Sequence, residues 1–177
     1  QRQMCIRDRA WVRGYQGNDL SADTTLMACV KHYALYGAAE AGRDYNTVDM
    51  SRVTAMNYYM RPYQAAVEAG VGSIMTSFNE FESIPATGNT WLLNDVLRKQ
   101  WGFNGFVVSD FTAIAEMVNH GIGNRQEVGV KALKAGVDMD MIADCYHAVL
   151  KKSLEEGKIT EAEIDSALSL IHISEPT

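Results

Sequence analysis

The sequence predicts an α/β fold of the parallel type, because helix-like and strand-like segments alternate along most of the chain. The segments AAVEAGVGSIM (65–75) and KALKAGVDMDM (131–141) share one form: a helix, then Ala-Gly-Val, then a strand. A similar step from helix through glycine to strand recurs at LRKQWGFNGFVV (97–108). Units repeating about every 30 residues imply parallel strands with right-handed crossovers. A TIM-type barrel or a doubly wound sheet would satisfy this pattern, and four such units would make half of a barrel.

Each element follows from local signals. Apolar runs rich in β-branched residues predict strands at 26–30, 73–78, 105–108 and 137–141. Amphipathic spacing predicts helices at 10–17, 51–69, 90–100, 113–118, 127–135, 145–156 and 160–170. Ser51 or Asp49 caps the second helix, Pro62 interrupts it, and Thr160 with Glu163 forms a capping box. Cys29, inside the first apolar run, is expected to be a small core residue.

Composition excludes several classes of function. A net charge of −6 argues against a nucleic-acid or anionic-membrane surface. No apolar run is long enough to span a bilayer. The three cysteines lie far apart without a CxxC pair, which gives neither a metal site nor a disulfide framework. No GxGxxG or GxxxxGK[ST] motif is present, so no nucleotide cofactor is expected.

The two ends differ from the rest. Residues 1–9 and 171–177 resemble translated sequencing-adapter read-through, and we interpret both as non-native ends. Residues 10–170 are then the authentic part, an internal piece of a longer gene.

The candidate chemistry lies at predicted strand ends. Residues 105–108 form a short buried strand that ends in Ser109 and Asp110, and α/β folds keep their active sites at such carboxyl ends. The simpler interpretation of Asp110 is a cap for the helix that begins near Thr112. Lys31 and His32 end the first strand, which must bend for both side chains to point the same way.

Other strand-end residues are Met75, Phe78, Asp138 and Asp140. Charged donors around a carboxylate, with Met or aromatic surfaces nearby, suit a polyhydroxylated substrate. Each also has a plain structural interpretation: Lys31 as a solvated edge residue, His32 as a satisfied half-buried histidine, and Met75 and Phe78 as core. At least one of Asp138 and Asp140 is expected to cap the next helix or to bond loop backbone.

The segments KHYALYGAAEAGRDYNTVDMS, GVGSIMTSFNEFESIPATGNTWLLNDVLRKQWGFNGFVVSDF and KALKAGVDMDM resemble the N-terminal barrel domain of family 3 glycoside hydrolases of the bacterial β-glucosidase type. The likeness runs from about Val12 to Leu170, and the order and spacing of its motifs make it specific. It implies a partial TIM-type barrel of about four β/α units.

The resemblance also implies a retaining hydrolase with Asp110 as the nucleophile that forms a covalent glycosyl-enzyme. Lys31 and His32 would hold sugar hydroxyls and favour ionised Asp110. Met75 would line the sugar subsite, and Arg43, with Tyr45, matches a loop near it. No metal or other cofactor is implied. The partners implied are an oligosaccharide or β-glucoside substrate and the missing C-terminal domain, with no nucleic acid and no membrane. Relatives are often periplasmic or secreted.

Two departures from the family matter. Phe78 stands where the family usually has Tyr, which removes a hydroxyl near the nucleophile. A retaining enzyme also needs an acid/base carboxyl, roughly 5–5.5 Å from the nucleophile. In the family a later domain supplies it, and Glu80, Glu82, Asp138 and Asp140 are poor substitutes, so the piece alone is expected to be inactive.

Three other functions fit parts of the sequence. A Schiff-base lyase would use Lys31 as its amine. A receiver-type phosphoacceptor domain would use Asp110 and Lys31, but the first strand lacks the acidic pair that binds Mg²⁺. A non-catalytic sugar-binding barrel would keep the fold without turnover.

Overall fold

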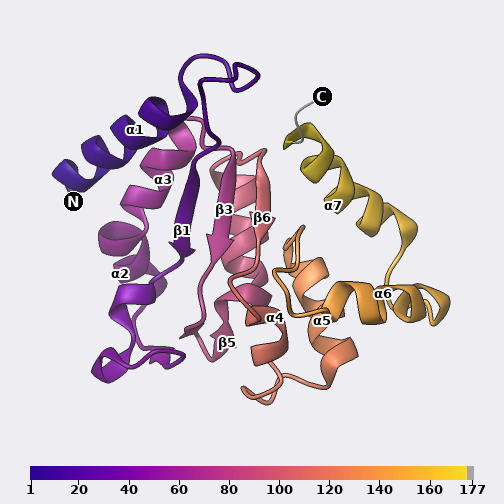
Figure 1. Ribbon diagram of the computed structural model, residues 1–177. Coiled ribbons are helices and arrows are strands. Elements are labelled where there is room, and N and C mark those ends of the chain that lie inside the picture. The colour runs from indigo at the N-terminus through magenta and orange to yellow at the C-terminus, as the bar shows by residue number, and fades with distance from the viewer. Residues whose placement is uncertain (175–177) are drawn as a thin grey trace.

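The computed structural model describes residues 1–174, and its centre is a parallel sheet (Figure 1). Strands β1 (Cys29–Tyr33), β3 (Ser73–Thr76) and β6 (Phe106–Val108) pair in the order β1-β3-β6, and both pairings are parallel. A single parallel bridge between Val108 and Met139 continues the sheet beyond β6. Within this sheet, each strand thus pairs with the next one of the sheet along the chain, as repeated β/α units require.

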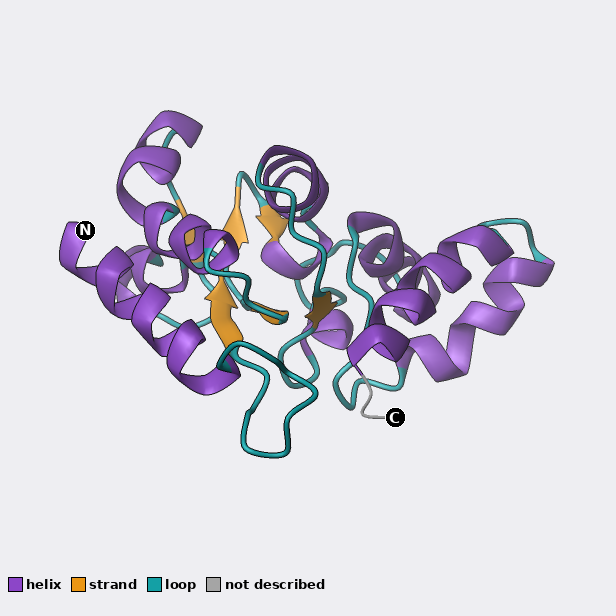
Figure 2. Cartoon of the chain, turned by 90° about the horizontal axis from the view of Figure 1, so that it is seen from above, coloured by secondary structure: helices purple, strands orange, loops and turns teal. Residues whose placement is uncertain are grey.

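Helices surround the strands on several sides, as the view from above shows (Figure 2). Helix α1 (Arg2–Gln16) packs on α3 (Arg61–Glu68), and α5 (Arg125–Ala135) packs on α6 (Cys145–Glu155). Further helical segments are α2 (Arg52–Thr54), η3 (Ala55–Tyr59), η5 (Trp91–Gln100), α4 (Ala113–Glu116) and α7 (Glu161–Ser174).

The core lies between the sheet and its helices. Ile74 and Val107, neighbours on β3 and β6, are fully buried. The predicted apolar face of the 90–100 helix is confirmed, since Leu92, Leu93, Val96 and Leu97 of η5 are all buried in the same cluster. The hydrogen bonds of η5 follow the wider π-helical pattern.

Short elements cross the carboxyl ends of the main strands. Strands β2 (Thr47–Val48), β4 (Glu80–Phe81) and β5 (Ile84–Pro85) form a second small sheet, in which β4 and β5 are antiparallel. Single helical turns flank it: η1 (Tyr36–Ala38), η2 (Glu40–Gly42) and η4 (Ala86–Gly88). The sequence pattern was too short here to predict anything but loop.

Several capping predictions are confirmed. The Ser51 side chain accepts a hydrogen bond from the Thr54 amide at the start of α2. Pro62 stands in the first turn of α3, which begins afresh at Arg61. The Thr160 and Glu163 side chains each bond to the backbone amide of the other residue, as a capping box requires.

Other predictions need correction. The first strand is Cys29–Tyr33 and excludes Leu26–Ala28; Cys29 is exposed instead of buried in the core. Residues 137–141 make only one bridge, because the Val107 carbonyl accepts from the amides of both Asp138 and Met139, and this interrupts a regular ladder.

Helices include the described residues of both predicted non-native ends, apart from Gln1. Residues 2–9 belong to α1, where an Arg9–Glu68 ion pair of 2.5 Å joins the helix to α3. Helix α7 continues through residues 171–174, and the last three residues of the predicted non-native tail lie outside the described part.

Candidate active site

Asp110 emerges directly from the carboxyl end of β6. Ser109 before it is buried; its amide donates to the Met139 carbonyl, and its hydroxyl accepts from the Met141 amide at 2.8 Å. These two bonds hold Ser109 against residues 139–141, so the backbone directly before Asp110 is fixed.

The carboxylate of Asp110 does not cap the following helix. One oxygen, Oδ1, accepts from the Phe111 amide at 2.7 Å, and α4 has Thr112 at its N-cap without a side-chain cap bond. The other oxygen, Oδ2, lies 3.3 Å from His32 Nε2. The Asp110 and His32 side chains are 13% and 26% exposed, so both are partly screened from water and still reachable.

His32 reaches Asp110 from a β-bulge in β1. Val30 pairs with Ile74 and Tyr33 pairs with Thr76, so three steps along β1 match two steps along β3. The predicted bend of this strand is therefore confirmed. Burial lowers the pKa of His32 despite the opposing effect of Asp110, which favours a neutral imidazole beside the carboxylate.

Three aromatic rings continue from His32 along the strand ends. The rings of His32 and Tyr36 are 5.1 Å apart, those of Tyr36 and Phe78 are 6.2 Å apart, and those of Phe78 and Tyr45 are 4.6 Å apart. The Tyr36 hydroxyl donates to Asp44 Oδ1 at 2.6 Å, and burial together with this bond raises the pKa of Tyr36. We call Tyr36, Phe78 and Tyr45 the aromatic wall.

Within residues 1–174, the other predicted site residues form no ion pair with Asp110. Lys31 is exposed on β1, and Met75 is half-buried on β3 opposite Val108. Arg43 is exposed in the loop before β2. Within residues 1–174 Arg43 forms no ion pair with Asp44, whose carboxylate instead accepts from Tyr36 and the Tyr45 amide.

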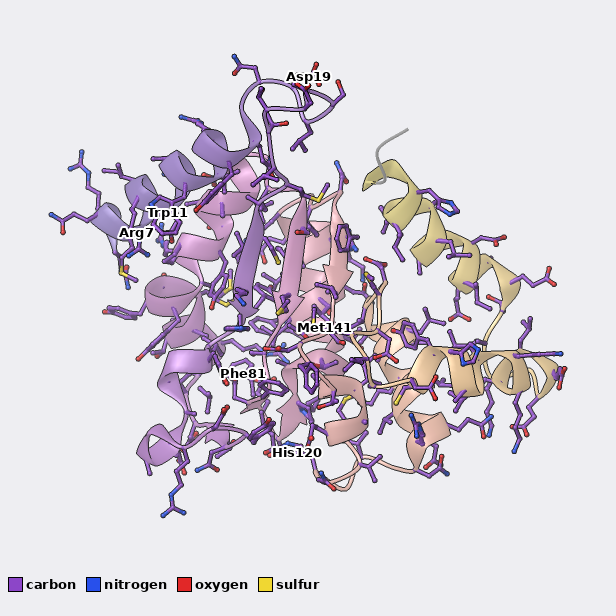
Figure 3. All side chains as sticks on the ribbon, in the orientation of Figure 1. Arg7, Trp11, Asp19, Phe81, His120 and Met141 are labelled. Atoms are coloured by element: carbon purple, nitrogen blue, oxygen red, sulfur yellow. The ribbon has the colours of Figure 1, made fainter. Side chains whose placement is uncertain are left out.

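The remaining nearby acids all have partners. Asp138 pairs with Arg98 at 2.6 Å, and Asp140 accepts from the Cys145 and Tyr146 amides at the start of α6. The prediction that at least one of these two aspartates caps the next helix or bonds loop backbone is confirmed for Asp140, whereas Asp138 accepts from the Val107 amide in strand β6. Glu80 bonds His120 at 2.6 Å, and Glu82 pairs with Arg52. In Figure 3, Phe81, the neighbour of Glu80, and His120 both lie below the strand arrowheads, with His120 the lower of the two.

No cluster of three or more His, Cys, Asp or Glu side chains suited to a metal ion occurs in residues 1–174. In the same part of the chain, no helix has the length and apolar character needed to cross a bilayer.

A family model described as the glycosyl hydrolase family 3 N terminal domain matches residues 7–173. The chain belongs to glycosyl hydrolase family 3. Its similarity to the periplasmic β-glucosidase of Salmonella typhimurium is 45% identity over 163 residues, covering 92% of this chain and 21% of that protein. A β-xylosidase of Formosa agariphila is 36% identical over 174 residues, covering 92% and 24%.

Among solved structures, the β-glucosidase from Listeria innocua superposes with a TM-score of 0.92 at 44% identity, covering 94% of this chain and 24% of that one. The same enzyme has been solved in complex with glucose, and a mutant of it in complex with laminaribiose. The chain thus spans between a fifth and a quarter of the length of these family 3 relatives.

Sequence reasoning missed some residues of the site. Tyr63 on α3 donates its hydroxyl to the His32 carbonyl at 2.6 Å, and Tyr36 joins the aromatic wall. No local signal could single out Tyr63, since it lies 31 positions from His32 on another element.

Proposed function

We propose that this chain carries the nucleophile of a retaining β-glucosidase-like hydrolase, and that Asp110 is that nucleophile. The observation that supports this most is the pairing of Asp110 with His32 at the strand ends of a family 3 chain. In the proposed reaction, an Asp110 oxygen bonds to the anomeric carbon as the bond to the leaving oxygen breaks. The leaving oxygen takes a proton from an acid, and water then hydrolyses the glycosyl ester.

The substrate contacts would be of two kinds. Lys31, His32 and Arg43 would donate hydrogen bonds to sugar hydroxyls, while Met75 and Phe78 would meet the apolar face of the ring. Neutral His32 suits this role because its Nε2–H can be shared between Asp110 and a hydroxyl. The names of the relatives favour a β-glucoside, with a β-xyloside as the nearest alternative.

The rest of the machinery would come from a longer protein. We propose that the three strands and the Met139 bridge represent about four units of a TIM-type barrel, within authentic residues 10–170. The acid/base would lie outside these residues, because Glu80, Glu82, Asp138 and Asp140 are all engaged elsewhere. The chain alone would then be inactive, and the periplasmic relative favours a periplasmic location.

Mechanism-based labelling tests the nucleophile separately from the acid. A full-length protein containing this chain is incubated with a 2-deoxy-2-fluoro-glucoside that bears an activated leaving group, and its peptides are analysed by mass spectrometry. The probe needs no acid to depart, so an adduct is expected on the peptide that contains Asp110. The Asp110→Asn variant should lose the adduct, whereas Asp49→Asn, a change at an exposed residue, should keep it.

A folded full-length protein that forms no adduct with the gluco-probe and none with the corresponding xylo-probe would contradict the proposal. The non-catalytic sugar-binding function would then be tested by calorimetry with glucose.

A further inference from the structure

The bulge that carries His32 is held by groups from outside β1. Because β1 has one residue more than β3 between the paired positions, the ordinary ladder cannot fix this stretch of backbone. Three consecutive carbonyls, those of His32, Tyr33 and Ala34, each accept a hydrogen bond from another element.

The donors come from α3 and from the end of β3. The Tyr63 hydroxyl donates to the His32 carbonyl at 2.6 Å. The Ser77 amide donates to Tyr33 at 2.8 Å, and the Ser77 hydroxyl and Asn79 amide group donate to Ala34 at 3.0 and 3.2 Å. Ser77 and Asn79 are fully buried, so these bonds are made away from water, where a lost partner is costly.

Tyr63 is the one donor in this set that holds His32 itself. Its ring packs edge-on against Tyr33 with centroids 5.3 Å apart, which fixes the direction of the hydroxyl. Burial raises the pKa of Tyr63 to about 12, so the hydroxyl remains a donor at neutral pH.

We infer that Tyr63 is a positioning residue of the active site, which sets the His32 imidazole against Asp110 by holding the His32 carbonyl. This inference rests on the proposed function, because it concerns the geometry of the same centre. A small displacement of a positioned group lowers rates steeply, by about 10²-fold for 1 Å.

Tyr33 provides a matched control. Its hydroxyl donates to the Leu92 carbonyl at 2.8 Å, so Tyr33→Phe and Tyr63→Phe each delete one hydroxyl bonded to a backbone carbonyl. Tyr33 is fully buried and its hydroxyl bonds to η5, so Tyr33→Phe leaves the hydrogen bond from Tyr63 to the His32 carbonyl in place.

The test uses a full-length protein that contains this chain and an aryl β-glucoside substrate. Tyr63→Phe is expected to lower kcat/KM by about 10-fold or more. Tyr33→Phe should stay within about threefold of the wild type, although both variants lose a comparable hydrogen bond and should lower Tm.

The deciding measurement repeats Tyr63→Phe in a His32→Ala background. His32→Ala keeps the backbone carbonyl, so the Tyr63 bond and its contribution to Tm survive. If Tyr63 acts through the imidazole, Tyr63→Phe should then change kcat/KM by less than about twofold, while its effect on Tm stays the same.

The possible outcomes separate a failure of the proposed function from a failure of the inference about Tyr63. A wild type with neither glycosidase activity nor an Asp110 adduct would overturn the proposed function, and this inference with it. An active wild type in which Tyr63→Phe leaves kcat/KM unchanged, or in which its loss persists without the imidazole, would overturn this inference alone. Should Tyr63→Phe fail to fold, Ser77→Ala, which removes one of the two hydrogen bonds to the Ala34 carbonyl, must show the same dependence on His32 for the inference to stand.

Discussion

Asp110 and His32 are two candidate site residues that could be predicted from the sequence alone. Both were predicted from their places after apolar runs, and the structure brings their side chains to 3.3 Å. Lys31 directly precedes His32 on the same strand, yet it is exposed, and the ion pair found for Asp110 within residues 1–174 is with His32. The register shift between Val30 and Tyr33, which carries His32, could not be deduced from local sequence.

The titration of His32 gives a prediction at this scale. Burial lowers its folded-state pKa below the ordinary value of 6.5, so the folded state binds fewer protons than the unfolded state near pH 6. The contribution of His32 to stability should therefore be complete above pH 6.5, and should be lost as the pH falls through the folded-state pKa. NMR of the His32 ring should give a midpoint below that of the same ring in urea. A folded-state midpoint equal to or above the midpoint measured in urea would contradict the prediction that folding lowers the pKa of His32.

The aromatic wall gives a second residue-scale prediction, within the proposed function. The Tyr45 ring lies 4.6 Å from Phe78 and is exposed, so it can stack on a sugar or an aryl leaving group. Tyr45→Ala in a full-length protein should raise KM for aryl β-glucosides by about 10-fold, which corresponds to about 1.4 kcal/mol. Tyr45→Phe keeps the ring and should retain the wild-type KM; equal KM for both variants and the wild type would exclude stacking at this ring.

At the scale of elements, one buried ion pair joins three segments. Arg98 on η5 donates to Asp138 and to the carbonyls of Phe103 and Gly105, while Asp138 also accepts from the Val107 amide of β6. Burial raises the pKa of Asp138 to about 6, with Arg98 opposing the shift. The sequence predicted that one aspartate of this segment bonds backbone, but Arg98, 40 positions away, gave no signal of pairing with it.

Breaking this pair should destabilise the fold strongly. Asp138→Asn leaves the Arg98 charge largely buried without its carboxylate, and is expected to lower the free energy of unfolding by about 3–5 kcal/mol. Asp95→Asn breaks the exposed Lys99–Asp95 pair and should cost less than about 1 kcal/mol. Urea unfolding of the chain, followed by circular dichroism, measures both. A similar loss in the free energy of unfolding for the two variants would mean that water solvates the Arg98 guanidinium once Asp138 is replaced.

At the scale of the whole molecule, apolar surface remains open along β1. A cavity of about 770 Å³ lies between α1, α3 and β1, and its lining includes Trp11, Leu26 and Tyr59, all of them exposed. Strand β1 pairs on one side only within the described residues, since the sheet order is β1-β3-β6. Unpaired strand edges and exposed apolar patches promote association.

The isolated chain should therefore bind apolar dyes and self-associate. We expect 8-anilinonaphthalene-1-sulfonate fluorescence to rise several-fold on adding the 177-residue chain, and light scattering to detect species larger than the 19.6 kDa monomer. A full-length protein containing the chain should show neither effect at equal molar concentration. If the isolated chain is monomeric and binds no dye, the exposed apolar surface beside β1 does not promote association, and the prediction is wrong.

The sequence by itself determined the parallel α/β class, strands β3 and β6, the buried face of η5 and the position of Asp110 at a strand end. These features depend on periodicity and on short-range capping, which are properties of neighbouring residues. Only the tertiary structure decided that His32 and not Lys31 reaches Asp110, that Tyr63 holds His32, that the aromatic wall forms, and that 137–141 makes a single bridge. Those outcomes depend on hydrogen bonds and packing between elements distant along the chain, and local pattern carries no information on such pairs.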